Sequence, residues 1–152
     1  MVFVKWINHK LLTFSLVFLA TDNPLYAFCS IPGSIFPDWI EGKPPSMGGS
    51  YGWQKRHRGF SHWFVPYFLL FYLVYYLKKN GFHFWGFPLL YDMVFFFFVG
   101  IFAHIFEDFF CGRIPVFSPS SRFGIRLFRV GSFLEYFFVF FVLLIASYFK
   151  YY

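Results

Sequence analysis

Long apolar stretches separated by short polar loops run through most of the chain. Three of them approach the ~20 residues that a helix needs to cross ~30 Å of hydrocarbon. These stretches are residues 60–77, 87–110 and 131–149. Because a backbone in lipid must satisfy its own hydrogen bonds, the pattern predicts three long transmembrane helices.

The first 38 residues are less regular. Leu11 to Ala20 and Leu25 to Phe36 are apolar, but the turn residues Thr21-Asp22-Asn23-Pro24 separate them. One continuous span would put Asp22 near mid-membrane at considerable cost. A cleaved signal peptide, with Lys5 and Lys10 as its basic region, lacks a good cleavage site. We favour a hairpin of two short helices with both ends on one side.

The predicted fold is therefore an all-α integral membrane protein with a single domain, residues 1–152. It has an N-terminal short-helix hairpin in residues 1–38, followed by the three transmembrane helices. The composition agrees, since 59% of the residues are hydrophobic and only 13% are charged, against about 25% charged residues in a soluble domain. Cys29 and Cys111 show no metal-ligand spacing and are expected to be buried thiols.

The formal net charge of +6 is concentrated in loops. Residues 41–58 and 113–129 are rich in arginine and lysine, and two predicted spans separate them, so they share one side of the membrane. Basic loops favour the cytoplasm, which predicts a protein of the bacterial inner (cytoplasmic) membrane with both loops inside. Such grouping marks topology rather than nucleic-acid binding. The expected partners are therefore membrane lipids, and no nucleic acid is expected.

Polar residues that are costly inside a membrane gather on that same side. His104 and Asp108 are four residues apart and share a helix face, while Glu107 faces either the same way or a neighbouring helix. One histidine alone is more often a hydrogen-bonded interior residue, and an ion path would spread such groups through the membrane depth. The full set is Asp38, His57, His62, His104, Glu107, Asp108 and Glu135, and the N-terminal hairpin adds His9 to it.

Imidazole nitrogen and carboxylate oxygen together suit Zn²⁺, Mn²⁺ or Fe²⁺. The convergence therefore predicts a site for one or more divalent metal ions, with zinc preferred. Metal ions are common machinery for phosphoester hydrolysis. Arg58 has a guanidinium suited to an anionic phosphate, and it equally suits a topology anchor. Glu135 is the only acid of the third span. It suits either a catalytic base or a partner of Arg126 or Arg129.

Four segments resemble a known family. They are "NHKLLTFS" (8–15), "IFPDW" (35–39), "RHRGFSHW" (56–63) and "GIFAHIFEDFFCGRIPVFSP" (100–119). In this order they resemble the YdjM-like family, which is described as LexA-regulated, membrane-bound, metal-dependent hydrolases. The resemblance spans most of the chain. The elements "HRGFSH" (57–62) and "GIFAHIFED" (100–108) are specific in combination.

The resemblance implies a set of metal-site residues and one departure. The family pattern has a second aspartate two residues after the first, where this chain has Ile40 followed by Glu41. Glu135 falls where the family tends to have an acid. Carried over by position, the implied metal residues are His9, Asp38, His57, His62, His104 and Asp108.

The predicted function is a membrane-bound metal-dependent hydrolase at the cytoplasmic membrane face. Its expected substrate is a phosphoester or a lipid headgroup, with Arg58 binding substrate and Glu135 as the catalytic base. The alternative is a non-enzymatic membrane protein with a structural metal site or an ion path. An open coordination position would favour the enzyme, and a site closed by protein ligands would favour the alternative.

Overall fold

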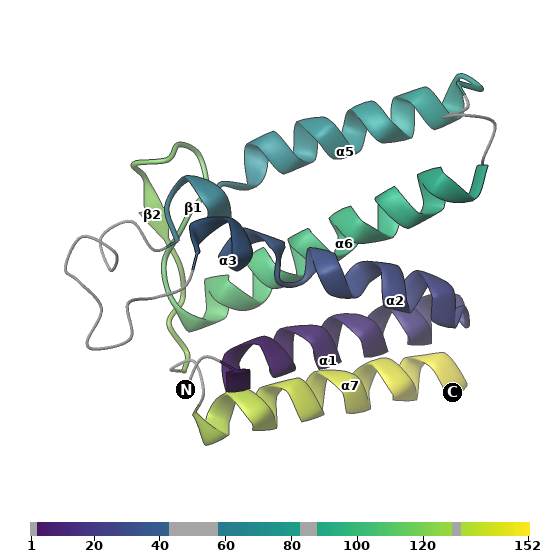
Figure 1. The fold of residues 1–152 in the computed structure, drawn as a ribbon. Coiled ribbons are helices and arrows are strands. Elements are labelled where there is room, and N and C mark those ends of the chain that lie inside the picture. Colours follow the sequence, from purple (N-terminus) through teal and green to yellow (C-terminus); the bar gives the residue numbers. More distant parts are fainter. Residues whose placement is uncertain (1–2, 43–57, 83–87, 129–131) are drawn as a thin grey trace.

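The computed structural model describes residues 3–42, 58–82, 88–128 and 132–152 (Figure 1). Its architecture is helical, as predicted, with one very short pair of strands. The elements are α1 (Phe3–Thr21), α2 (Pro24–Gly33), α3 (Phe36–Glu41), η1 (Phe60–His62), α5 (Phe64–Lys79), α6 (Pro88–Cys111), β1 (Ile114–Pro115), β2 (Arg122–Phe123) and α7 (Phe133–Tyr151).

The helices α1 and α2 lie side by side and run in opposite directions. Asn23 caps α2 by accepting a hydrogen bond from the backbone N–H of Leu25 at 2.9 Å, and Pro24 supplies a preset first position. Asp22 takes a left-handed backbone conformation, with φ of 53°. It forms an ion pair with Lys150 near the end of α7. The turn of this pair therefore lies at the end of the molecule where α7 finishes.

The helices α2 and α6 approach each other closely, and glycine makes the approach possible. A Cβ on Gly100 would lie 2.0 Å from the carbonyl oxygen of Ser30, and one on Gly33 would lie 1.9 Å from that of Phe97. Without hydrophobic driving force in lipid, small residues that let backbones approach are a usual way to join helices. The close approach places the C-terminal end of α2 directly against the middle of α6.

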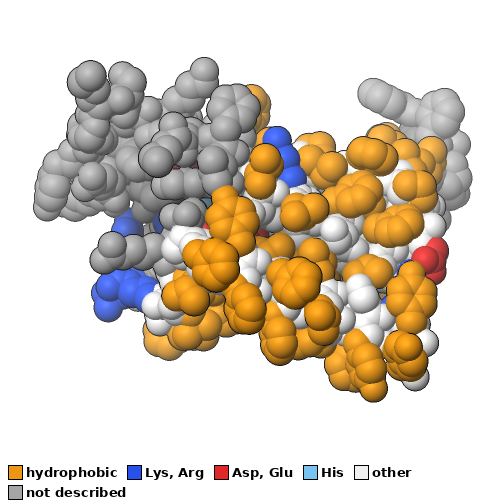
Figure 2. Space-filling model, turned by 90° about the horizontal axis from the view of Figure 1, so that it is seen from below, with side chains coloured by type: hydrophobic (Ala, Val, Ile, Leu, Met, Phe, Trp, Pro, Cys, Tyr) orange, Lys and Arg blue, Asp and Glu red, His pale blue; other side chains and the backbone are white. Residues whose placement is uncertain are grey.

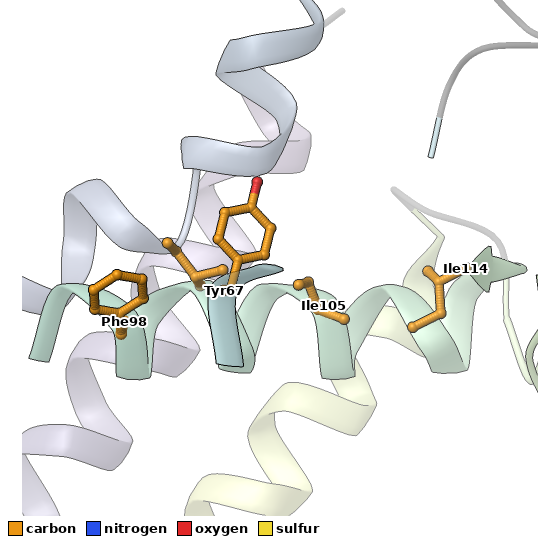
Figure 3. Close-up of a cluster of buried hydrophobic side chains, with 5 residues drawn as sticks. Tyr67, Phe98, Ile105 and Ile114 are labelled. Carbon is orange, nitrogen blue, oxygen red and sulfur yellow. The ribbon is translucent and has the colours of Figure 1, made fainter. Parts of the chain in front are cut away.

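Apolar packing joins α5 to the other face of α6. Tyr67 on α5, together with Phe98, Ile105 and Ile114, forms a buried cluster that also includes Ile101 (Figure 3). The hydroxyl of Tyr67 donates a hydrogen bond to the carbonyl oxygen of Ser61 at 2.8 Å. The cluster thereby fixes the short helix η1 that precedes α5.

The segment after α6 folds back over the end of that helix. The strands β1 and β2 pair antiparallel, with Ile114 opposite Phe123. Beyond β2, the N–H groups of Ile125 and Leu127 donate to the carbonyl oxygens of Phe109 and Phe110. Terminal carbonyls of a helix have no partner within it, so this segment supplies the hydrogen bonds that the end of α6 requires.

Two described helices are long and apolar enough to cross a membrane: Leu89–Cys111 and Phe133–Tyr151, of 23 and 19 residues. The helix α5 has 16 residues and is not among them. Hydrophobic side chains cover most of the described surface on the face seen in Figure 2. The exposed ones on α7 include Phe137, Phe140, Phe141, Leu144 and Phe149. Such a surface is suited to lipid.

One end of the bundle collects the segments that the sequence analysis singled out. The starts of α1, α5 and α7 and the end of α6 all lie at the end that carries β1 and β2 (Figure 1). The short helices α3 and η1 pack against each other there. The polar residues of these segments are therefore brought to one end of the molecule.

Candidate metal centre

Four side chains from three segments meet at this end. They are Asp38 on α3, His62 on η1, and His104 and Asp108 one turn apart on α6, each offering one donor atom within 4.8 Å of the others. His62 and His104 are completely buried, and the side chain of Asp108 is 3% exposed. Asp38, with its side chain 19% exposed, marks the edge nearest to solvent.

The spacing of the donor atoms fits a tetrahedral ion. Ligands ~2.0–2.1 Å from zinc lie roughly 3.3 Å from one another. Here Nε2 of His62 lies 3.1 Å from Nε2 of His104, 3.0 Å from Oδ2 of Asp108 and 3.5 Å from Oδ1 of Asp38. Nε2 of His104 lies 3.8 Å from both carboxylates. Two imidazoles and two carboxylates at these distances form a donor set for one divalent ion.

Both histidines are held by their other ring nitrogen. Nδ1 of His104 donates to the backbone carbonyl of Ser34 at 2.7 Å. Nδ1 of His62 lies 3.1 Å from Oε1 of Glu41 and 2.9 Å from the hydroxyl of Ser61. An acceptor at Nδ1 fixes the proton there and leaves the Nε2 lone pair for an ion. Glu41 and Ser34 thus orient the two imidazoles.

The hydrogen bonds of His62 also change its acidity. Burial alone would lower the pKa of His62, but hydrogen bonds to Asp108, Asp38 and Glu41 outweigh burial and raise that pKa well above the ordinary value. Burial would raise the pKa of Asp38, but the hydrogen bond to His62 and the electrostatic interactions with His104 and His62 together outweigh burial and lower that pKa. A divalent ion would therefore compete with a proton at His62.

Arg58 contacts the centre from one side. Its Nη2 donates to Oδ1 of Asp108 at 2.6 Å. The backbone N–H of Arg58 donates to Oε1 of Glu41 at 2.8 Å, and its φ of 57° is left-handed. A Cβ on Gly112 would lie 1.8 Å from Nη1 of Arg58, so the guanidinium occupies the space above that glycine. The predicted substrate-binding arginine thus lies against a predicted metal ligand.

His9 lies beside the four donors but is not one of them. Its ring centroid is 4.3 Å from that of His104, and its Nε2 is 4.0 Å from Oδ1 of Asp108. Its Nδ1 contacts Oε2 of Glu107 at 2.6 Å. The sixth residue that the resemblance implied, His57, lies outside the described residues.

Glu135 is completely buried at the start of α7. Its Oε1 accepts a hydrogen bond from Nδ2 of Asn8 at 2.7 Å, which ties α7 to α1. It is not one of the four grouped donors. Of its two predicted ion partners, Arg129 lies outside the described residues.

Sequence reasoning did not assign three of the residues that shape the centre. Ser34 acts through its backbone carbonyl, which leaves no signal in a sequence. Glu107 and Glu41 were noted without a role. The i,i+3 spacing from Asp38 to Glu41 could have placed both acids on one helix face.

The fold and the site together define a helical membrane protein with a buried histidine–aspartate centre at one end. The family model for the YdjM inner membrane protein matches residues 4–151. The chain therefore belongs to that family, as the resemblance predicted, and is an inner membrane protein. No curated protein and no solved structure matches it.

Proposed function

We propose that this protein is a membrane-bound hydrolase that uses a divalent metal ion, with zinc preferred, to cleave a phosphoester or a lipid headgroup. The observation that carries the proposal is the four-donor group of Asp38, His62, His104 and Asp108, with spacing suited to one tetrahedral ion. Groups such as His104 and Asp108 are costly inside a membrane helix, so their convergence with Asp38 and His62 calls for a functional reason.

Each residue of the centre has a role in this proposal. The two histidines and two aspartates hold the ion, which when bound would lower the pKa of a water and polarise the ester. Arg58 has its guanidinium at the edge of the donor group and would contact the anionic phosphate while Nη2 stays on Asp108. Glu135 would accept the proton at its carboxylate, which Asn8 orients.

The orientation follows from the charged loops. With α5 as a third span, the arginine-rich sequence segments 41–58 and 113–129 would share one membrane side, and basic loops favour the cytoplasm. Of these segments, the described Arg58, β1 and β2 lie at the end of the molecule that holds the metal centre. The centre would then lie at headgroup depth on the cytoplasmic face, which favours a membrane-associated substrate. Single cysteines at Ser50 and Asn80, after removal of Cys29 and Cys111, test this. Labelling of Ser50 from the periplasmic side would reverse the orientation.

One observation favours a structural metal site instead. Four protein donors already complete a tetrahedron, whereas catalytic zinc usually has three protein ligands and an open position. In the enzymatic function, Asp38 is the ligand best placed to leave the ion, because its side chain is the most exposed of the four. An aspartate that leaves the ion would open a position toward solvent.

Elemental analysis and an activity assay on the purified protein in mild detergent distinguish these functions. We expect stoichiometric metal, and hydrolysis of a fluorogenic phosphoester or a phospholipid that is lost in the double variant His62→Ala, His104→Ala. Asp92→Asn is the control, since Asp92 is an acid of the same helix that pairs with Lys78. Metal without hydrolysis of either substrate would support the structural site, and absence of metal from the wild type would overturn both.

A further inference from the structure

A buried carboxylate on α6, that of Glu107, lies next to the centre without belonging to the four grouped donors. Glu107 is 1% exposed, on α6 between two of the grouped donors. Its Oε2 contacts Nδ1 of His9 at 2.6 Å, and within the described part of the chain its Oε1 has no hydrogen-bond partner. Burying a half-satisfied carboxylate is costly. Because Glu107 stays buried in spite of this cost, its contact with His9 calls for a functional explanation.

The contact repeats an arrangement already present twice at this site. His62 and His104 each have Nδ1 held by an oxygen acceptor, Glu41 in one case and the carbonyl of Ser34 in the other, and each directs Nε2 at the donor group. His9 has the same arrangement, with Glu107 as the acceptor. Its Nε2 lies 4.0 Å from Oδ1 of Asp108, and its ring lies against His104.

We propose that Glu107 is a positioning residue for His9. By accepting a hydrogen bond from Nδ1 it fixes the proton on that nitrogen and directs the Nε2 lone pair of His9 toward the metal centre. There His9 would be a fifth donor, from α1, beside the four grouped ones, in a five-coordinate site. The inference rests on the metal site of the proposed function but not on hydrolysis. Outer carboxylates that orient histidine ligands typically change metal affinity by ~10–100-fold.

Among the described residues, Glu107 is the acid whose carboxylate contacts Nδ1 of His9. His9 and Glu107 come from helices that start and end at this end of the molecule, so the contact also fixes the depth of α1 against α6. Asn8, the preceding residue, is engaged by Glu135 and faces α7. Replacing Glu107 by a residue without an acceptor atom would therefore leave the imidazole of His9 free to rotate, with its proton on either nitrogen.

Zinc titration of the full-length protein in detergent tests the proposal, with Asp92→Asn as the matched acid control on α6. Glu107→Met removes the acceptor and suits a buried helix. We expect it to weaken zinc binding by ~10–100-fold, and Glu107→Gln to weaken it less because its amide oxygen still accepts from Nδ1. His9→Ala should match Glu107→Met, and the double variant should lose no more than either single variant.

A second readout is the ¹⁵N NMR signature of His9, which separates the two tautomers. The Nδ1–H form should dominate in the wild type and in Glu107→Gln, and it should be lost in Glu107→Met. Wild-type zinc affinity in Glu107→Met, or fully additive losses in the double variant, would overturn the role of Glu107. If the wild type bound no zinc, the metal site of the proposed function would be wrong. Separately, an unchanged His9 tautomer in Glu107→Met would overturn the role of Glu107 in positioning His9.

Discussion

Gly100→Ala should both destabilise the protein and weaken metal binding. The added Cβ would lie 2.0 Å from the carbonyl oxygen of Ser30 and 2.9 Å from the backbone nitrogen of Ser34, and real Cβ contacts essentially never fall below 3.0 Å. Both neighbours are backbone atoms that no rotamer change can move. The helices α2 and α6 must therefore separate by roughly 1 Å or more, and overpacking of this kind costs about 1–3 kcal/mol.

The separation reaches the metal centre because Ser34 terminates α2. Its carbonyl oxygen accepts the hydrogen bond from Nδ1 of His104 at 2.7 Å, and a shift of about 1 Å would break a hydrogen bond of that length. The lost bond adds about 1 kcal/mol, so we expect a total destabilisation of roughly 2–4 kcal/mol. Losing the partner that orients a histidine should also lower metal affinity about tenfold.

Two measurements check this expectation: denaturant unfolding in a fixed detergent, and zinc titration of the folded protein. Phe106→Leu is the control, because Phe106 lies on the same helix with 63% of its surface exposed. The reasoning would be refuted by a Gly100→Ala variant with wild-type unfolding and wild-type zinc affinity. Destabilisation with unchanged zinc affinity would show that the Ser34 carbonyl does not orient His104.

Three further predictions concern the centre itself. The double variant His62→Ala, His104→Ala should lose all stoichiometric metal by elemental analysis. The pKa of His62 is higher in the folded protein than its ordinary value of 6.5. Protonated His62 therefore stabilises the metal-free protein in full below pH 6.5, and this stabilisation is lost as the pH rises through the raised pKa. Zinc affinity should accordingly rise with pH over that window, with proton release measurable by calorimetry in buffers of different ionisation enthalpy. Glu135→Gln should keep its metal and lose on the order of 10²-fold or more in hydrolysis if Glu135 is the base, whereas a structural role would lower thermal stability and leave activity per folded molecule unchanged.

Much of this arrangement could be predicted from the sequence because membrane burial makes polar residues informative. The i,i+4 spacing of His104 and Asp108 fixes their shared helix face. The alternation of spans brings Asp38 and His62 to the same membrane side, and the structure groups these four donors. The span expected at residues 60–77 is the part that remains a prediction, since α5 has 16 residues and depends on its flanking segments to cross.

What the sequence could not supply are the contacts that turn these residues toward one another. The acceptor for His104 is a backbone carbonyl, which any residue at position 34 would provide. The guanidinium of Arg58 reaches Asp108 only because Gly112 has no side chain and because Arg58 adopts a left-handed backbone. The glycine at position 112 is visible in the sequence, but its contact with Arg58 and the backbone angle of Arg58 are not, because each depends on how separate segments pack.

The departure from the family pattern at position 40 has a physical explanation in α3. Asp38 and Glu41 are three residues apart and share a helix face, while Ile40 is turned outward and is 52% exposed. An acid at position 40 of this helix would face away from the centre. Glu41 is longer and faces inward, where its Oε1 lies 3.1 Å from Nδ1 of His62 and accepts from the backbone of Arg58. The chain therefore keeps a second acid at the site, where it orients a histidine and an arginine instead of joining the four donors that would hold the ion.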